Sequence, residues 1–425
     1  MRRFLLISYV FPPAGGGGVQ RPAKFAKYIG RFGWEPVVVT VKNPSVPSRD
    51  ESLLKDLPPE LIVRRLPTLE PSPPAEPAPG GGGEPGPVGR LKKWVAGKLF
   101  PDRHVLWIPL ALPGALRAAR RHKVEAVMVT APPFSTFMLG AAVARRLDLP
   151  LVLDFRDEWS GYYAQGFSPS AEDSGRAERV LHAERRLVDQ AARVIGASDA
   201  YCRRFRHLHG WQEEKYVWIP NGYDPDDFPP ADQPPSRHRP GERLKLLYTG
   251  TVFAVTSLDP LWAGLAGLDP DKRRHWEVEI CGRAVPGQVL DPGLEGLTVS
   301  RPGYLDHDEV IKRMTRADVL VLTLADLPGS QRVIPGKVFE YLAARRPILA
   351  LVPRGEAAAI VNGCQAGRVV EPGNTAELTK LLEYWLDDPP PALGPPPEQF
   401  SRINLAGRLA EVLEQAVVAH QEADR

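Results

Sequence analysis

Short apolar runs alternate along the chain with segments of helical periodicity. Residues 4–10 and 36–40 have the length and composition of buried strands, and residues 19–32 between them repeat apolar positions at helical spacing. The same alternation resumes at residues 244–249 and continues to residues 367–370. Strands and helices that alternate in this way are typical of parallel sheets with helices on both faces. The sequence therefore predicts an α/β fold with two doubly wound parallel sheets.

A proline-rich segment separates the two series. Residues 229–241 have the composition of a linker and no apolar periodicity. We therefore expect an N-terminal Rossmann-like domain over residues 1–228, a C-terminal Rossmann-like domain over residues 242–398, and a terminal helix over residues 399–425. Two such domains would face a cleft at the carboxyl ends of their strands, where ligands bind in folds of this class.

Two segments of the first domain differ from it in composition. Residues 71–89 are rich in proline and glycine, which predicts a flexible loop without a core of its own. Residues 90–100 are basic and amphipathic, with aromatic residues among the lysines. That pattern fits peripheral contact with an anionic membrane surface, and the alternative is a surface helix that packs Trp94 and Leu91 on its domain.

Composition favours a cytoplasmic protein. The 54 basic and 51 acidic residues give a net charge of +3, which provides no reason to expect a nucleic-acid partner. Cys202, Cys281 and Cys364 lie far apart without CxxC spacing, which argues against a disulfide framework or a zinc site. No apolar run approaches the roughly 18 residues that span a bilayer. Any membrane contact is expected to be peripheral, at the inner face.

The most informative motif is PGKVFEYLAARRPIL at residues 335–349. It predicts a helix that opens at Pro335 and is followed by a buried strand. Lys337 and Glu340 fall on one face of the first turn, which carries free N–H groups and partial positive charge. A phosphate suits the lysine and the amides, and the carboxylate can accept hydrogen bonds from a sugar diol. The alternative is an exposed Lys–Glu pair on a surface helix.

A glycine-rich segment, FPPAGGGGVQR at residues 11–21, joins the first predicted strand to the first helix. Glycines such as Gly17 and Gly18 let a backbone approach a ligand closely, and a helix N-terminus favours anions. The segment is not GxGxxG, and no acidic residue follows the second strand as a dinucleotide site requires. Both observations count against a nicotinamide enzyme. The alternative is a flexible surface loop.

A second polar motif, DFRDEW at residues 154–159, follows a buried strand. Its polar groups should therefore emerge at the carboxyl end of the first sheet, where ligands bind. Arg156 or Asp157 there can orient an acceptor hydroxyl or accept its proton. The alternative is an Arg–Asp pair that braces the loop. The histidines, His104 among them, have no metal-ligand spacing and are expected to be ordinary surface or core residues.

Together these motifs resemble retaining bacterial glycosyltransferases of the GT-B fold, in glycosyltransferase family 4. Residues 8–21 resemble the opening of the cell-surface-polysaccharide enzymes, residues 154–159 resemble their Asp-Phe-Arg-Asp-x-Trp segment, and residues 335–349 resemble their donor-site segment. The resemblance implies polysaccharide biosynthesis, a nucleotide-diphosphate sugar donor, most often UDP-linked, and transfer with retention. It implies a glycan, lipid-linked or small-molecule acceptor, a terminal helix that crosses back to the first domain, and neither a metal nor another cofactor.

The resemblance also implies roles for individual residues. Glu340 would hold the donor ribose, and Asp157 or Arg156 would face the acceptor. The donor diphosphate would be bound by Lys337, Gly336, Arg332, Gly250, Thr251, Gly17 and Gly18. Many relatives carry an Arg and a Lys just after the glycine that matches Gly250, and a second Glu where this chain has Arg332. Arg332 and Lys337 would supply the missing charge, or the donor is held differently.

Two other functions stay open at this point. One is a sugar-nucleotide epimerase or isomerase on the same fold, which needs an acid/base group beside the sugar. The other is a non-catalytic partner subunit that binds a nucleotide sugar or a lipid-linked glycan. The absent Arg/Lys pair and the substituted glutamate are the observations that keep that second alternative open.

Overall fold

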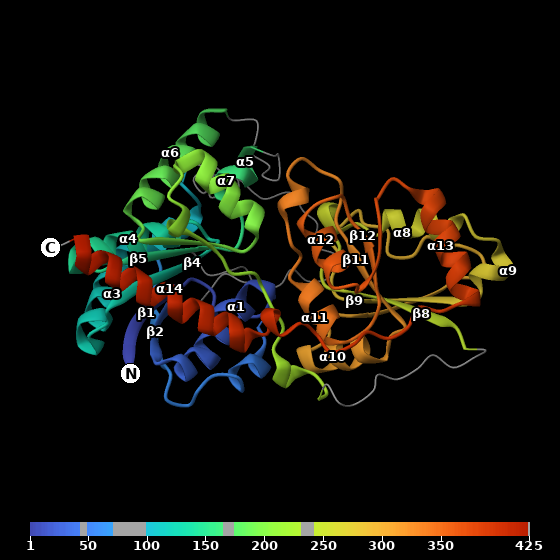
Figure 1. Ribbon diagram of the computed structural model, residues 1–425, viewed down its shortest axis with the longest axis horizontal. Helices are drawn as coiled ribbons and strands as arrows, with labels where there is room; N and C mark the ends of the chain where they lie inside the picture. The colour runs from blue at the N-terminus through green and yellow to red at the C-terminus, as the bar shows by residue number, and fades with distance from the viewer. Residues whose placement is uncertain (43–48, 71–98, 165–173, 231–241, 424–425) are drawn as a thin grey trace, which may run out of the picture. The chain divides into compact units, whose positions relative to one another are not determined.

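The computed structural model describes residues 1–42, 49–70, 99–164, 174–230 and 242–423 (Figure 1). The chain divides into two compact units, here called the first unit (Met1–Pro220 with Leu405–Arg425) and the second unit (Asn221–Asn404). The predicted flexible loop at 71–89, most of the basic segment at 90–100 and residues 231–241 of the predicted linker lie outside the described residues. The predicted domain boundaries and the expected cleft stay predictions.

The first unit is built on a seven-stranded sheet in which every neighbouring pair is parallel. The order is β3-β2-β1-β4-β5-β6-β7, so the connections reverse direction between β1 and β4. A ligand site is expected at such a reversal. The strands are β1 Arg2–Ser8, β2 Trp34–Val41, β3 Ile62–Leu66, β4 Ala126–Ala131, β5 Leu151–Phe155, β6 Arg193–Gly196 and β7 Tyr216–Trp218.

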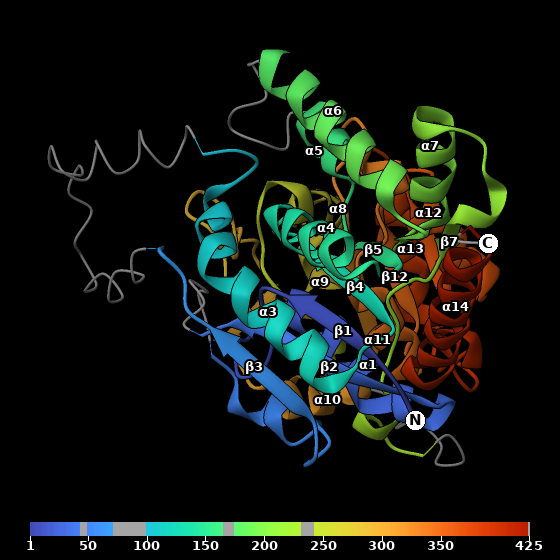
Figure 2. The same cartoon turned by 90° about the vertical axis from the view of Figure 1, so that its left-hand side faces the viewer.

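Helices cover both faces of this sheet. The helices α3 and α4 lie on one face, where their side chains pack against Leu5, Ile7 and Val37, and α1 and α14 lie on the other (Figures 1 and 2). Most of α14 belongs to the first unit. An ion pair between Arg2 of β1 and Glu414 of α14 joins the helix to the sheet. The helices are α1 Gly17–Tyr28, α3 Ile108–His122, α4 Ser135–Leu147, α5 Trp159–Ala164, α6 Ser174–Gln190, α7 Asp199–His209 and α14 Arg402–Ala423.

The second unit repeats the plan with a six-stranded parallel sheet in the order β10-β9-β8-β11-β12-β13. Its reversal lies between β8 and β11. The strands are β8 Leu244–Thr249, β9 Trp276–Cys281, β10 Thr298–Gly303, β11 Val319–Thr323, β12 Ile348–Leu351 and β13 Gly367–Val370. The helices are α8 Asp259–Ala266, α9 Pro270–Arg273, α10 His307–Arg316, α11 Lys337–Ala343, α12 Glu356–Gly363 and α13 Thr375–Asp387.

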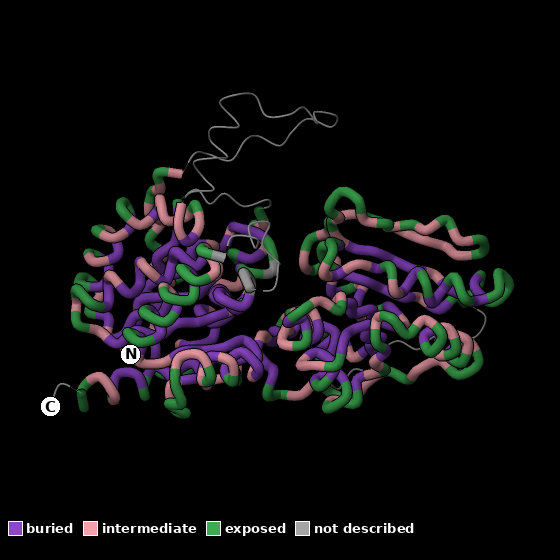
Figure 3. The backbone as a smooth tube through the Cα atoms, turned by 90° about the horizontal axis from the view of Figure 1, so that it is seen from above, coloured by how far each residue is buried: buried purple, intermediate pink, exposed green. Residues whose placement is uncertain are grey.

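The apolar runs that predicted strands form the interior of both sheets. Phe4, Leu6, Leu247 and Leu320 are fully buried, and Figure 3 shows buried backbone running through the middle of each unit. Strands with helices on both faces need apolar side chains on both faces, which explains the continuous rather than alternating pattern. In the described part of the chain, none of the helices combines the length and apolar composition that a bilayer-spanning segment needs.

Candidate active site

In the second unit, the carboxyl end of β8 and the start of α11 bring two predicted donor-binding residues together. The ammonium of Lys337 lies 3.9 Å from the centre of the Tyr248 ring. A Cβ added at Gly250 would meet the Lys337 Nζ at 3.2 Å, and Gly250 has a φ of +107°, a left-handed conformation that favours glycine. The lysine therefore reaches across the backbone at the end of β8, beside the reversal of the sheet.

The next turn of α11 fixes this arrangement. The Tyr341 hydroxyl lies 3.1 Å from both the amide nitrogen and the Oγ1 of Thr249, and 3.3 Å from the carbonyl oxygen of Val321. Burial raises the pKa of the Tyr341 hydroxyl far above its ordinary value, so the group stays neutral and can donate. Tyr341 therefore ties α11 to β8 and β11, the two strands at the reversal.

The start of α11 differs from the prediction. The helix begins at Lys337, two residues after Pro335, and has seven residues. The amide of Val338 donates to the Pro335 carbonyl at 3.0 Å, and the amide of Phe339 donates to the Gly336 carbonyl at 3.3 Å. The tight turn that contains Pro335 therefore occupies amides that the sequence predicted to be free. Positive charge at this site must come from side chains, and Lys337 provides it.

The carboxylate of Glu340 is partly buried among charged groups. Burial raises its pKa above the ordinary value, which the charges of His307, Arg402 and Lys337 only partly offset, while the charge of Asp227 adds to the increase. His307 and Asp227 themselves form a pair, with Nε2 and Oδ2 2.9 Å apart. Sequence analysis missed this pair because 80 residues separate its members, and only the fold brings them together.

The other predicted donor-binding residues of this unit lie in the loop after β8 and in the segment that leads into α11. Thr251 is exposed, and its carbonyl accepts hydrogen bonds from the Tyr248 hydroxyl at 3.0 Å and the Thr256 hydroxyl at 2.9 Å, which shapes the loop after β8. Gly336 is exposed at the N-cap of α11. Arg332 is partly buried in the turn Ser330–Arg332 between β11 and α11. Their contacts with a donor stay predictions.

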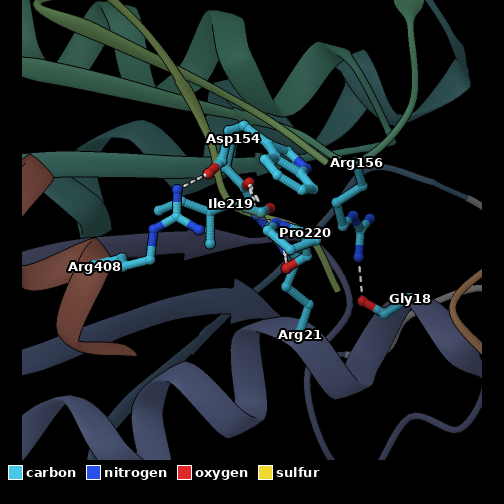
Figure 4. Close-up of polar contacts among 8 residues, drawn as sticks. Gly18, Arg21, Asp154, Arg156, Ile219, Pro220 and Arg408 are labelled. Carbon is cyan, nitrogen blue, oxygen red and sulfur yellow. Dashed lines mark hydrogen bonds and ion pairs between the residues drawn. The ribbon is translucent and has the colours of Figure 1, made fainter. Parts of the chain in front are cut away.

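In the first unit, Arg156 holds the glycine-rich segment in place. Its guanidinium donates to the carbonyl oxygen of Gly18 (Figure 4) and to that of Pro132, so it joins the start of α1 to the segment after β4. A Cβ at Gly18 would lie 3.1 Å from the Arg156 Nη1, which explains why a glycine suits this position. Gly17 and Gly18 open α1, and the first amides of a helix have no acceptor within it.

Asp157, the other predicted acceptor-side residue, is exposed at the end of β5. The described hydrogen bonds of the Arg156 guanidinium go to backbone carbonyls and not to Asp157. They therefore do not support the alternative in which Arg156 and Asp157 brace the loop. Arg156 has a structural task at the reversal of the first sheet, and Asp157 has a carboxylate that a ligand can reach. A role for either residue towards an acceptor stays a prediction.

A buried ion pair behind this site was missed by the sequence analysis. Arg21 and Asp154 are 1% and 0% exposed, and the guanidinium contacts both carboxylate oxygens at 2.7–3.1 Å. Arg21 also donates to the carbonyls of Ile219 and Pro220, at 2.8 and 2.7 Å (Figure 4). Arg21 therefore links α1, β5 and the segment that follows β7. All these donors are used within the protein, which leaves anion binding to other groups.

A second cluster lies after β1, where His104 was predicted to be an ordinary surface or core residue. The Glu70 carboxylate accepts hydrogen bonds from Tyr9 at 2.7 Å and Thr68 at 3.0 Å, and its Oε2 lies 2.8 Å from His104 Nδ1. Burial alone raises the pKa of Glu70, but the contacts with His104 and Tyr9 outweigh it and hold that pKa below its ordinary value of 4.5. The carboxylate therefore stays charged in the folded protein.

Replacing Glu70 with glutamine should make the first unit less stable in a pH-dependent way. The pKa of Glu70 is lower in the folded protein than in the unfolded chain. Its contribution to the free energy of unfolding is therefore complete above the unfolded pKa and is lost as the pH falls through the folded pKa. We expect a loss of about 1–3 kcal/mol near neutral pH that shrinks as the pH falls below about 4. Urea unfolding across this range measures it, with exposed Glu60→Gln as control. A loss independent of pH would contradict the assignment.

The protein has two doubly wound parallel sheets, and polar and basic groups lie at the reversal of each. Folds of this kind bind ligands at the reversal. The GT-B enzymes are a class of protein with two such domains. Sequence models of two families match this chain. The glycosyl transferase 4-like domain matches residues 16–222, and the glycosyl transferases group 1 domain matches residues 243–388. The chain belongs to the glycosyltransferases of the GT-B fold. It is therefore a glycosyltransferase enzyme.

Individual proteins are similar to this chain in sequence or in fold. The chain is 26% identical over 316 residues to a D-inositol 3-phosphate glycosyltransferase of Nocardiopsis dassonvillei. The aligned region covers 72% of this chain and 71% of that protein. The fold is similar to that of Anabaena HepE in complex with UDP and glucose, with a TM-score of 0.57, 16% identity and coverage of 100% and 98% of the two chains. It is also similar to sucrose-phosphate synthase of Thermosynechococcus elongatus, with a TM-score of 0.60, 16% identity and coverage of 99% and 94%.

Proposed function

We propose that this glycosyltransferase takes its sugar from a nucleotide-diphosphate donor, with UDP as the nucleotide, and that the second unit binds the donor at the carboxyl end of β8. The observation that carries the proposal is the position of Lys337. Its ammonium lies across Gly250 at the reversal of the sheet, where this fold class binds ligands. UDP in the complex of HepE, which has a similar fold, supports the choice of nucleotide.

Each predicted donor residue then has a chemical task. Lys337 and Arg332 neutralise the diphosphate as negative charge develops on it, and Gly250, Thr251 and Gly336 let the backbone approach it closely. Electrostatic stabilisation of a leaving group in this way is commonly a large contribution to catalysis. Glu340 accepts hydrogen bonds from the ribose hydroxyls. These tasks need neither a metal ion nor another cofactor, because charged side chains supply the counter-charge.

For the acceptor, we propose a hydroxyl-bearing glycan, lipid-linked or small molecule at the edge of the first unit. The exposed carboxylate of Asp157 lies at the end of β5, and Arg156 holds the segment that begins at Gly18. Gly17 and Gly18 open α1, whose first amides can meet an anionic group. The resemblance to family 4 supports transfer with retention and a place in polysaccharide biosynthesis. The relative named for D-inositol 3-phosphate provides a first acceptor to assay.

A thermal-shift screen tests the donor proposal. UDP, GDP, ADP, dTDP and their common sugar conjugates are added in turn, because a ligand that binds only the folded state raises the unfolding temperature by mass action. We expect UDP and UDP-sugars to stabilise the protein selectively. Stabilisation by another nucleotide would correct the base but keep the donor site. No shift from any nucleotide would overturn the proposal.

Removing the charge of Lys337 should weaken binding of the diphosphate in particular. We expect Lys337→Met to weaken UDP binding about 10-fold or more, because hydrogen bonds to charged groups contribute about 1.5–3 kcal/mol each. Calorimetric titration of UDP into both proteins measures the change. Lys272→Met, which removes a lysine paired with Glu383 on the same unit, serves as control. Equal UDP affinity in wild type and Lys337→Met would contradict the proposed site.

We also propose a cytoplasmic location with peripheral contact at the inner membrane face through residues 90–100. The basic, aromatic composition of that segment supports the contact. Sedimentation with vesicles that contain anionic lipid tests it, comparing wild type with a variant in which Lys92, Lys93 and Lys98 are glutamines. Equal sedimentation of the two proteins would contradict the contact.

A further inference from the structure

We propose that Tyr248 is a positioning residue that fixes the Lys337 ammonium for contact with the donor diphosphate. This inference rests on the proposed function, and it adds to the site a residue that the sequence analysis did not select. Tyr248 is fully buried in β8, and the centre of its ring lies 3.9 Å from the Lys337 Nζ. That distance is well within the range of a cation–π interaction.

Two kinds of contact hold the Tyr248 ring in place. Its hydroxyl donates to the carbonyl oxygen of Thr251 at 3.0 Å, and its apolar edge packs in the core of the second unit with residues such as Leu246 and Val278. The ring is therefore held at both ends, by a hydrogen bond and by packing. The Thr251 carbonyl also accepts from the Thr256 hydroxyl at 2.9 Å, so the loop after β8 does not depend on the Tyr248 hydroxyl alone.

A ring face is a better support for a phosphate-binding lysine than a carboxylate. Among the described residues, no carboxylate forms an ion pair with Lys337, whereas Lys245 in the same unit pairs with Glu277 and Glu279 at 3.2 and 3.4 Å. An ion pair would cancel the charge and occupy the N–H donors. The electron-rich face attracts the ammonium and leaves its charge uncancelled, so the N–H groups that point away from the ring stay available for phosphate oxygens.

The backbone on both sides is adapted to this contact. Gly250 provides room for the ammonium, because a Cβ there would approach Nζ to 3.2 Å and Cε to 3.6 Å. Tyr341, four residues after Lys337 and so on the same face of α11, bonds to Thr249 at 3.1 Å. Consecutive residues of β8 therefore hold consecutive turns of α11. A long lysine side chain that is already ordered loses less conformational entropy when it binds a ligand.

The test compares UDP with uridine as probes, because only UDP carries the diphosphate. We expect Tyr248→Leu to weaken UDP binding about 3- to 30-fold and to leave uridine binding unchanged, and Tyr248→Phe, which keeps the ring, to stay near wild type. In Lys337→Met, the further change Tyr248→Leu should have no additional effect on UDP. Equal losses for UDP and uridine, or the same loss with and without Lys337, would overturn the proposal.

A second comparison keeps the shape of the core. Pentafluorophenylalanine at position 248 reverses the charge distribution of the ring face, so it should weaken UDP binding relative to Tyr248→Phe. Equal UDP binding by these two variants would overturn the proposal even if Tyr248→Leu fails to fold. The ring also shifts the NMR signal of the ¹³C-labelled Lys337 side chain without any ligand. Absence of that shift would refute the position of the lysine, whereas its presence without UDP binding would refute only the proposed function.

Discussion

Replacing Glu340 with alanine is expected to weaken binding of the nucleotide-sugar donor about 10- to 100-fold. A carboxylate that accepts hydrogen bonds from a ribose diol makes charge-assisted bonds, which contribute about 1.5–3 kcal/mol each. The side chain is only partly buried and lies among His307, Arg402 and Lys337, so it is positioned to accept such bonds. Calorimetric titration of the donor into wild type and variant measures the loss.

Stability provides the control for this prediction. Burial raises the pKa of the Glu340 carboxyl, which means that its surroundings in the ligand-free protein disfavour the charged form. Glu340→Ala should therefore change the melting temperature little, and Glu295→Gln, at an exposed position of the same unit, should change neither quantity. Donor binding should also weaken as the pH falls through the raised pKa, because the protonated carboxyl is a poorer acceptor. Parallel losses of melting temperature and affinity would show that Glu340 is structural.

Breaking the Arg21–Asp154 pair is expected to cause the largest loss of stability. Both side chains are almost completely buried, and the removal of one partner leaves an uncompensated charge in the interior. We expect Asp154→Ala or Arg21→Ala to lower the free energy of unfolding of the first unit by about 3–5 kcal/mol. Hydrogen exchange of the β1 and β5 amides measures this quantity for the first unit alone.

The double variant distinguishes an ion pair from two independent contributions. Arg21→Met with Asp154→Leu removes both charges, so its loss should be smaller than the sum of the two single losses. Arg3 and Glu35 form the matched exposed pair of the same unit, each 41% exposed, and breaking that pair should cost less than about 1 kcal/mol. Strictly additive losses for Arg21 and Asp154 would contradict the coupling.

The alternation of apolar runs was sufficient to predict two parallel α/β sheets, because strands covered on both faces must be apolar throughout. The motifs at residues 11–21 and 154–159 could also be placed at carboxyl ends of strands, since each follows an apolar run directly. Gly250 and Lys337 were selected separately from their motifs, and the structure brings them together. The contacts of the predicted site residues with donor and acceptor stay predictions.

The contacts between distant segments could not be predicted from the sequence. Arg21 and Asp154 were both within recognised motifs, but 133 residues separate them, and nothing local indicates the pairing. The sequence indicates only that Tyr248 belongs to a strand. Its contact with the Lys337 ammonium becomes visible when the fold places α11 beside β8. The start of α11 was predicted wrongly because Pro335 suits a first helical position, whereas the chain uses it in a preceding tight turn.

Hydrogen–deuterium exchange with and without UDP tests the central claim most directly. The donor site in the second unit predicts that UDP slows exchange at residues 248–252 and 336–341, and that Lys337→Met removes most of this protection. Protection confined to other segments of the chain, with these two unchanged, would contradict the location of the donor site and with it the roles proposed for Lys337, Glu340 and Tyr248.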